Sequence, residues 1–164
     1  MKKGSILAQP FVMIMALVVM GLVILFGIRA VLQIKSTADT TELVKFAINL
    51  ENQVELMYNY NAGSVKDLSL NMPAVIEKIC FSNPGEPVTS RVDDGFFKRI
   101  LEADKTNNVF IHPLRNFKKF DYKIDNLRVK SDENPLCIET NGRLNGVMET
   151  IVYDNKIFVE IRRT

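Results

Sequence analysis

The chain has 164 residues, of which 47% are hydrophobic and 24% are charged, and its formal net charge at pH 7 is +2. A charge balance this close to zero does not indicate the strongly basic surface typical of nucleic-acid binding, so no nucleic-acid partner is expected. About a hundred residues follow position 60, which is enough for one small hydrophobic core.

The N-terminal residues predict a membrane helix. Residues 1–5 form a short leader with two lysines, and residues 11–28 contain no charged or polar side chain. Residues 6–34 are long enough to cross the roughly 30 Å of a bilayer's hydrocarbon core as one helix. A removable secretory signal has an apolar region of only about 7–15 residues, so an uncleaved anchor is favoured. The positive charges ahead of the span predict a cytoplasmic N-terminus and an extracellular C-terminal domain. The lipid bilayer is the first expected partner.

The leader also carries a short motif. Lys2-Lys3-Gly4, directly followed by an apolar helix, resembles the leader of type IV pilins and the class III signal peptides of archaeal pilins. This resemblance implies cleavage between Gly4 and Ser5, which makes Gln9 the fifth residue of the processed chain. Most members of that family have a glutamate there, which pairs with a neighbouring subunit's amine during assembly, and Gln9 departs from the pattern. The overall layout, in which Gly63-Ser64-Val65 follows the long helix, also resembles uncharacterised membrane-anchored proteins of small-genome archaea.

Residues 35–60 are predicted to form an amphipathic helix, which continues from the membrane helix directly or through a short polar break at 35–41. Apolar residues recur there at helical spacing and share one face: Leu43, Phe46, Ala47, Leu50, Val54, Met57 and Tyr58. Polar residues such as Lys45, Asn49, Asn52 and Glu55 occupy the opposite face. Such a stripe indicates a helix that packs on its own domain, and the alternative is a self-associating coiled coil.

Residues 61–164 are expected to form an α+β head. A short helix is predicted at 93–103, where Asp93-Asp94 would cap the N-terminus. Strands are predicted at 65–70, 75–81, 109–114, 120–129, 136–140, 143–153 and 156–161. Asn141-Gly142 and Asp154-Asn155 are typical of tight hairpin turns, which favours a C-terminal antiparallel β-meander. The predicted fold is therefore a long N-terminal helix packed on a small antiparallel sheet.

The two cysteines are candidates for a disulfide. Cys80 and Cys137 are the only cysteines and fall in two different predicted strands. If the head is outside the cell, an even cysteine count in an oxidising compartment favours a bridge between them. Two buried free thiols, or metal or redox chemistry, are the alternatives.

No motif in the chain indicates a reaction, a metal or a cofactor. His112 is the only histidine, and one histidine cannot by itself complete a catalytic triad or a histidine-based metal site. It is expected to be structural or exposed. Asp132-Glu133-Asn134 lacks the spacing of a calcium-binding loop. We therefore expect neither an enzyme nor a small-molecule substrate.

One basic stretch interleaved with aromatic residues is a candidate binding surface. It consists of Arg115, Phe117, Lys118 and Lys119, in a region that otherwise is interpreted as a solvated turn between strands. Its partner would be an anionic surface: lipid headgroups, a surface polymer or, last, single-stranded DNA.

Two functions follow from these observations. In the first, the chain is a pilin-like structural subunit of a surface filament or pseudofilament and contacts itself or other pilin-like subunits. In the second, it is a single-pass membrane-anchored protein whose external domain binds a partner.

Overall fold

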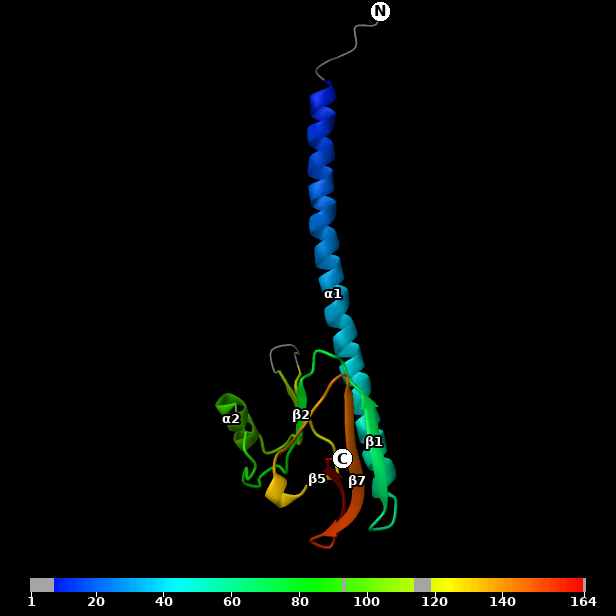
Figure 1. Cartoon of the computed structure of the whole chain (residues 1–164), viewed down its shortest axis with the longest axis vertical. Helices are drawn as coiled ribbons and strands as arrows, with labels where there is room; N and C mark the ends of the chain where they lie inside the picture. Colours follow the sequence, from blue (N-terminus) through cyan, green and yellow to red (C-terminus); the bar gives the residue numbers. More distant parts are fainter. Residues whose placement is uncertain (1–7, 93, 114–118, 164) are drawn as a thin grey trace, which may run out of the picture. The chain divides into compact units, whose positions relative to one another are not determined.

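The structure is a computed structural model that describes residues 8–92, 94–113 and 119–163, with the backbone alone at 8–10 and 33–39. The chain divides into two units, Met1–Asp39 and Thr40–Thr164, and the second is called the head below. The fold class is α+β, as predicted. A long N-terminal helix, α1 (Ala8–Tyr58), precedes a second helix, α2 (Gly95–Ala103), and two four-stranded sheets (Figure 1).

Helix α1 has 51 residues and contributes to both units. Pro10 lies in its first turn, where a missing backbone N–H is tolerated, and no proline follows before Tyr58. The helix runs through residues 35–41, so the polar stretch there does not interrupt it.

The part of α1 inside the head buries the predicted apolar stripe. Leu43, Phe46, Leu50, Val54 and Met57 are each at most 1% exposed and belong to the main hydrophobic core. The opposite face of this part of the helix is exposed. The prediction that the amphipathic helix packs on its own domain is therefore confirmed.

The first sheet, sheet A, has the strand order β1-β7-β8-β5. Its strands are β1 (Val65–Asn71), β7 (Arg143–Tyr153), β8 (Lys156–Arg162) and β5 (Leu127–Val129). The β7–β8 hairpin turns at Asp154 and Asn155, whose φ angles of 50° and 58° are those of a tight primed turn, as predicted. β5 pairs parallel to β8, so the sheet is mixed rather than antiparallel.

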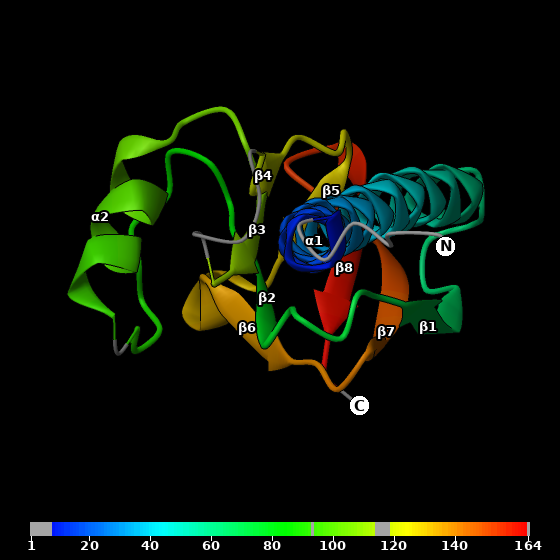
Figure 2. The same ribbon diagram turned by 90° about the horizontal axis from the view of Figure 1, so that it is seen from above.

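The second sheet, sheet B, has the order β4-β3-β2-β6 (Figure 2). Its strands are β4 (Asp121–Tyr122), β3 (Val109–His112), β2 (Lys78–Phe81) and β6 (Leu136–Glu139). One face of sheet B joins the main core, through residues such as Ile79 and Ile111. The other face carries α2, because Phe97 and Leu101 pack in a second cluster with Cys80 and Phe110.

The predicted C-terminal meander is wrong between β6 and β7, because these two consecutive strands belong to different sheets, whereas the β7–β8 hairpin is present as predicted. β6 pairs with β2 in sheet B, whereas β7 pairs with β1 and β8 in sheet A. The turn at Asn141-Gly142 is therefore no hairpin turn. Gly142 has a φ of 75°, and its carbonyl accepts a hydrogen bond from the Met72 N–H at 3.0 Å.

Two other strand predictions also need correction. The strand expected at 120–129 is two strands in two sheets, and Asn126, with a φ of 62°, lies between them. The strand expected at 75–81 begins only at Lys78. A short 3₁₀ helix, η2 (Ser131–Glu133), follows β5.

Buried asparagines hold the crossing between the sheets. The Asn83 side chain accepts a hydrogen bond from the Val129 N–H and donates one to the Val129 carbonyl, both at 2.9 Å. The Asn108 side chain accepts from the Ile124 N–H at 2.8 Å and donates to the Ile124 carbonyl at 2.7 Å. These side-chain amides provide hydrogen-bond partners for backbone groups near the points where the chain passes from one sheet to the other.

Candidate functional site

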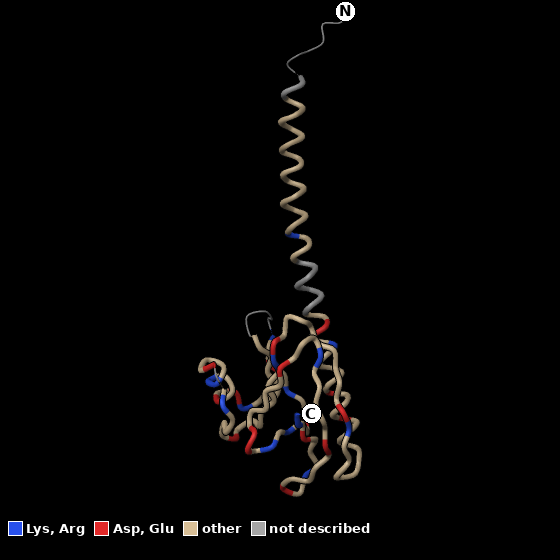
Figure 3. Tube along the Cα trace, in the orientation of Figure 1, with Lys and Arg blue, Asp and Glu red and all other residues tan. Residues whose placement is uncertain are grey.

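The segment Phe11–Leu32 is long and apolar enough to cross a membrane. It has 22 residues, a mean hydropathy of 3.0 and no buried part. Its large hydrophobic side chains are between 49% and 70% exposed, and Arg29 is its single charged residue (Figure 3). An exposed apolar surface of this size needs lipid or protein around it. The predicted membrane segment is thus confirmed as a candidate span.

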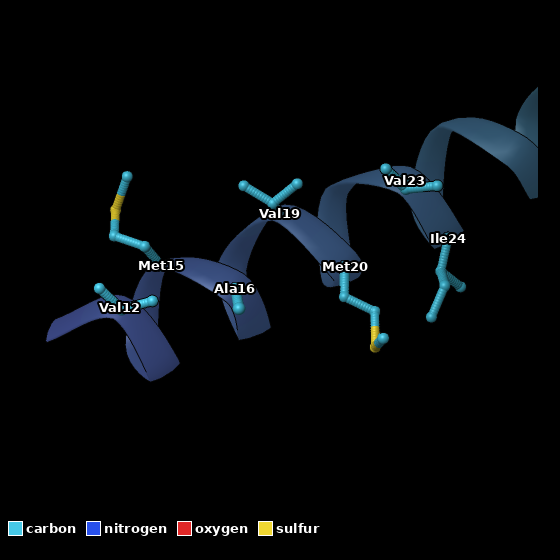
Figure 4. A pocket seen from close by; sticks show the side chains of 7 residues that line it. All are labelled: Val12, Met15, Ala16, Val19, Met20, Val23 and Ile24. Carbon is cyan, nitrogen blue, oxygen red and sulfur yellow. The ribbon is translucent and has the colours of Figure 1, made fainter. Parts of the chain in front are cut away.

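The surface of this segment has a shallow apolar recess. It is lined by Val12, Met15, Ala16, Val19, Met20, Val23 and Ile24. Figure 4 shows Val19 and Val23 on one side of the helix and Met20 and Ile24 on the other, with the short side chain of Ala16 near them. A surface of this kind can hold a lipid chain or a side chain of a neighbouring helix.

The leader-peptidase residues Gly4 and Ser5 lie outside the described residues. Gln9 is within α1, but its side chain is not described. The cleavage and the assembly role that the pilin resemblance implies therefore remain predictions.

The disulfide prediction is confirmed, since Cys80 and Cys137 are joined and lie directly opposite each other on β2 and β6. The Cys80 side chain is fully buried, and the bridge lies in the cluster that α2 covers through Phe97 and Leu101. The two cysteines are 57 residues apart in sequence, so the bridge links β2, the first strand of sheet B along the chain, to the much later strand β6.

The lone histidine is in a cluster that the sequence did not predict. His112 Nδ1 lies 3.6 Å from Glu77 Oε2, and His112 Nε2 lies 3.7 Å from Asp94 Oδ2. The ring also packs edge-on against Phe97, with 5.8 Å between ring centroids. Because the two carboxylates face opposite ring nitrogens, they cannot join the ring around one metal ion. Pairing of β2 with β3 places Lys78 beside His112, so only the strand register would have revealed this cluster.

Asp94 caps α2, as the sequence predicted. Its Oδ1 accepts hydrogen bonds from the N–H groups of Phe96 at 2.9 Å and Phe97 at 3.3 Å. These bonds, that of Phe97 first, hold the pKa of the Asp94 carboxyl below its ordinary value, and His112 lowers it further. Asp93, the other predicted cap, lies outside the described residues.

The basic aromatic stretch is described only at its end. Arg115, Phe117 and Lys118 lie outside the described residues. Lys119 lies with its Nζ 4.8 Å from the centre of the Tyr122 ring, a cation–π contact. A surface for an anionic partner therefore stays a prediction.

Two further places in the head carry polar side chains that a ligand could contact. Asp132 is ion-paired with Lys130 at 3.0 Å, and the described part of the chain contains no group of three side chains that could hold a metal ion. A groove of about 560 Å³ lies between α1 and the end of β1. It is lined by Glu42, Lys45, Phe46, Asn49, Ser69, Leu70, Asn71 and Met72.

Comparison with known protein families, curated proteins and solved structures finds no match for this chain. Its function must therefore be argued from its own residues.

Proposed function

We propose that this chain is a pilin-like structural subunit of a surface filament or pseudofilament. Helix α1 would insert in the membrane and assemble with self or other pilin-like subunits, and the head would be exposed outside the cell.

The observation that carries the proposal is the double use of α1. One helix supplies both the membrane-length apolar segment Phe11–Leu32 and the stripe from Leu43 to Met57 that the head buries. A subunit of this layout can leave the bilayer and exchange lipid for neighbouring helices while the head keeps its core. The leader motif Lys2-Lys3-Gly4 adds to this support through its resemblance to pilin leaders.

Two features support an extracellular head. The positive charges of the leader precede the span and favour a cytoplasmic N-terminus. The Cys80–Cys137 disulfide fits an oxidising compartment. Protease added to intact cells should then remove the head, and full protection of the head would overturn this orientation.

The test of the subunit function is Gly4→Leu. This change should block a prepilin peptidase while it leaves the apolar span unaltered. We expect the variant to accumulate in membranes with the leader still attached, as intact-mass measurement would detect, and to vanish from filaments sheared off the cell surface.

The matched control is Gly21→Leu, the same substitution inside the span. A Cβ at Gly21 meets no atom within 4 Å, so this variant should be processed like the wild type. If Gly4→Leu matches the wild type in mass and distribution, the pilin-like proposal fails.

A single-pass anchored protein whose external domain binds a partner is the second candidate. The departure at Gln9 favours it, because a glutamine lacks the charge that would pair with a neighbouring subunit's amine. An unprocessed wild-type chain that never leaves the membrane would support this reading.

A further inference from the structure

The four sheet edges of the head are unequally protected. At one edge of sheet A, the three-residue strand β5 has its outward groups capped: Asn83 bonds both backbone groups of Val129, and Asn108 donates to the Leu127 carbonyl at 3.3 Å. In sheet B, β4 has two residues, and β6 has four, with the Cys137 carbonyl bonded by Arg163. Short and capped edges do not recruit other strands.

The other edge of sheet A is β1, which has seven residues. At its two ends, the Met72 N–H donates to Gly142 at 3.0 Å, and the Ser64 carbonyl accepts from Thr150 at 2.9 Å. In an antiparallel pair, only every second residue of an edge strand forms backbone hydrogen bonds with its neighbour. Met72 bonds to the residue just before β7 and Ser64 bonds to β7 itself, and both have even numbers. The even residues of β1 therefore bond to β7.

The odd residues Val65, Asp67, Ser69 and Asn71 consequently direct their N–H and C=O groups away from the sheet. All four residues are exposed, and Val65 is 61% exposed. Within the described residues, none of these backbone groups has a hydrogen-bond partner. The strand contains no proline, and the one lysine on it, Lys66, donates to Gln53 Oε1 on α1 at 2.8 Å. The edge thus has neither the proline nor the bulge that block strand addition, and its charged residues are Lys66 and Asp67.

Full overlap of two β1 strands matches outward-facing residues on both copies. Full antiparallel overlap of two copies places Val65 opposite Asn71 and Asp67 opposite Ser69, around a two-fold axis at Leu68. All of these are outward-facing residues, so about eight backbone hydrogen bonds can form. A shift by one residue would place the outward-facing odd residues of one copy opposite even residues of the other, whose backbone groups already bond to β7. A shift by two in one direction would set Asp67 opposite Asp67 of the second copy, which like charge disfavours.

A groove lies beside one end of the strand. The groove of about 560 Å³ is lined by Ser69, Leu70 and Asn71 on one side and by residues of α1 on the other.

We propose that the β1 edge is a self-association surface, on which a second copy of the chain pairs its own β1 antiparallel in the register centred on Leu68. The pairing joins two copies of sheet A into one continuous sheet. It concerns the head alone. Because α1 runs antiparallel to β1, with Gln53 beside Lys66 and Glu42 near Asn71, the pairing directs the two α1 helices in opposite directions, so it joins copies that are not anchored side by side in one membrane.

The deciding variant is Ser69→Pro in the full-length protein in detergent. Proline is tolerated where the strand N–H faces solvent, so the sheet should stay intact while one outward donor per copy is lost. We expect the dimer dissociation constant, measured by analytical ultracentrifugation, to rise by about tenfold or more. Ser69→Ala is the matched control and should dimerise like the wild type. An unchanged thermal unfolding curve and intact disulfide would confirm that Ser69→Pro remains folded.

Hydrogen exchange supplies a second, independent measurement on the wild type. The amides of Asp67 and Ser69 should be protected at high protein concentration and exchange at low concentration, whereas those of Leu68 and Leu70 should be protected at both. A protein that stays monomeric at all concentrations would overturn the proposal. So would a dimer that survives Ser69→Pro, or odd-residue amides whose exchange is independent of concentration. Protection of these amides in native membranes but not in the purified protein would identify a different partner.

Discussion

Asn83→Ala should destabilise the head more than a substitution of one polar side chain normally does. Asn83 is 6% exposed, and Val129, whose backbone it bonds twice, is fully buried. The alanine leaves the N–H and C=O of Val129 without partners. Each buried backbone group without a partner costs about 1–3 kcal/mol, so with two such groups we expect the free energy of unfolding to fall by about 2–6 kcal/mol.

The assay is thermal and urea unfolding of the full-length protein in detergent, followed by tyrosine fluorescence. All four tyrosines lie in the head, so this signal reports head unfolding without a contribution from the membrane span. A loss of this size lowers the Tm of the head by roughly 8–24 °C. Hydrogen exchange at the Val129 amide should accelerate in the same variant.

Asn59→Ala is the matched control. The Asn59 side chain is exposed and donates to the Glu55 carbonyl at 2.8 Å, so its loss should change stability by no more than about 0.5 kcal/mol. If Asn83→Ala proves as stable as Asn59→Ala, the asparagine does not hold the crossing between the sheets and the reasoning is refuted.

Three further predictions concern the head. Replacing Cys80 and Cys137 by serine should lower its stability by about 4 kcal/mol in urea unfolding, because the bridge closes a loop of 57 residues, and an equal loss on reduction of the wild type would support this. The Asp94 carboxyl has a folded pKa below its unfolded pKa, so the stability it contributes is present above the unfolded pKa and is lost as pH falls through the folded pKa. Asp94→Asn keeps the helix cap and should remove this pH dependence from amide exchange in α2. Gly146→Ala should cost about 1–3 kcal/mol in thermal unfolding, since its Cβ would lie 3.0 Å from the Arg162 carbonyl; a neutral effect would mean that this strand pair can move apart.

Local patterns predicted the elements well. The stripe from Leu43 to Met57 was predictable because a helix that buries one face repeats its apolar residues every three or four positions. The bounds of β7 match the prediction. The turn at Asp154-Asn155 was predictable because tight hairpins favour residue types that adopt positive φ at these two positions. The disulfide followed from the cysteine count and the strand positions.

The sheet membership of each strand was not predictable from local patterns. β6 and β7 are separated by a turn sequence that also suits a hairpin, yet the Gly142 carbonyl bonds Met72, some seventy residues earlier in the chain. The break between β4 and β5 depends on Asn108, whose side chain accepts a hydrogen bond from the Ile124 N–H. The cluster around His112 depends on strand register for the same reason. In each case, the deciding partner is distant in sequence.

The double use of α1 also limits how this protein can be divided. A soluble fragment that begins after Met57 would lose five buried side chains from the main core. Loss of each large core side chain costs about 2–5 kcal/mol, and a whole domain is stable by only about 5–15 kcal/mol. The head is therefore not a module that recombination could transfer to another anchor at the end of the helix. A protease that sheds an intact head must cut before Leu43, and an engineered chimera must exchange its anchor upstream of the same residue.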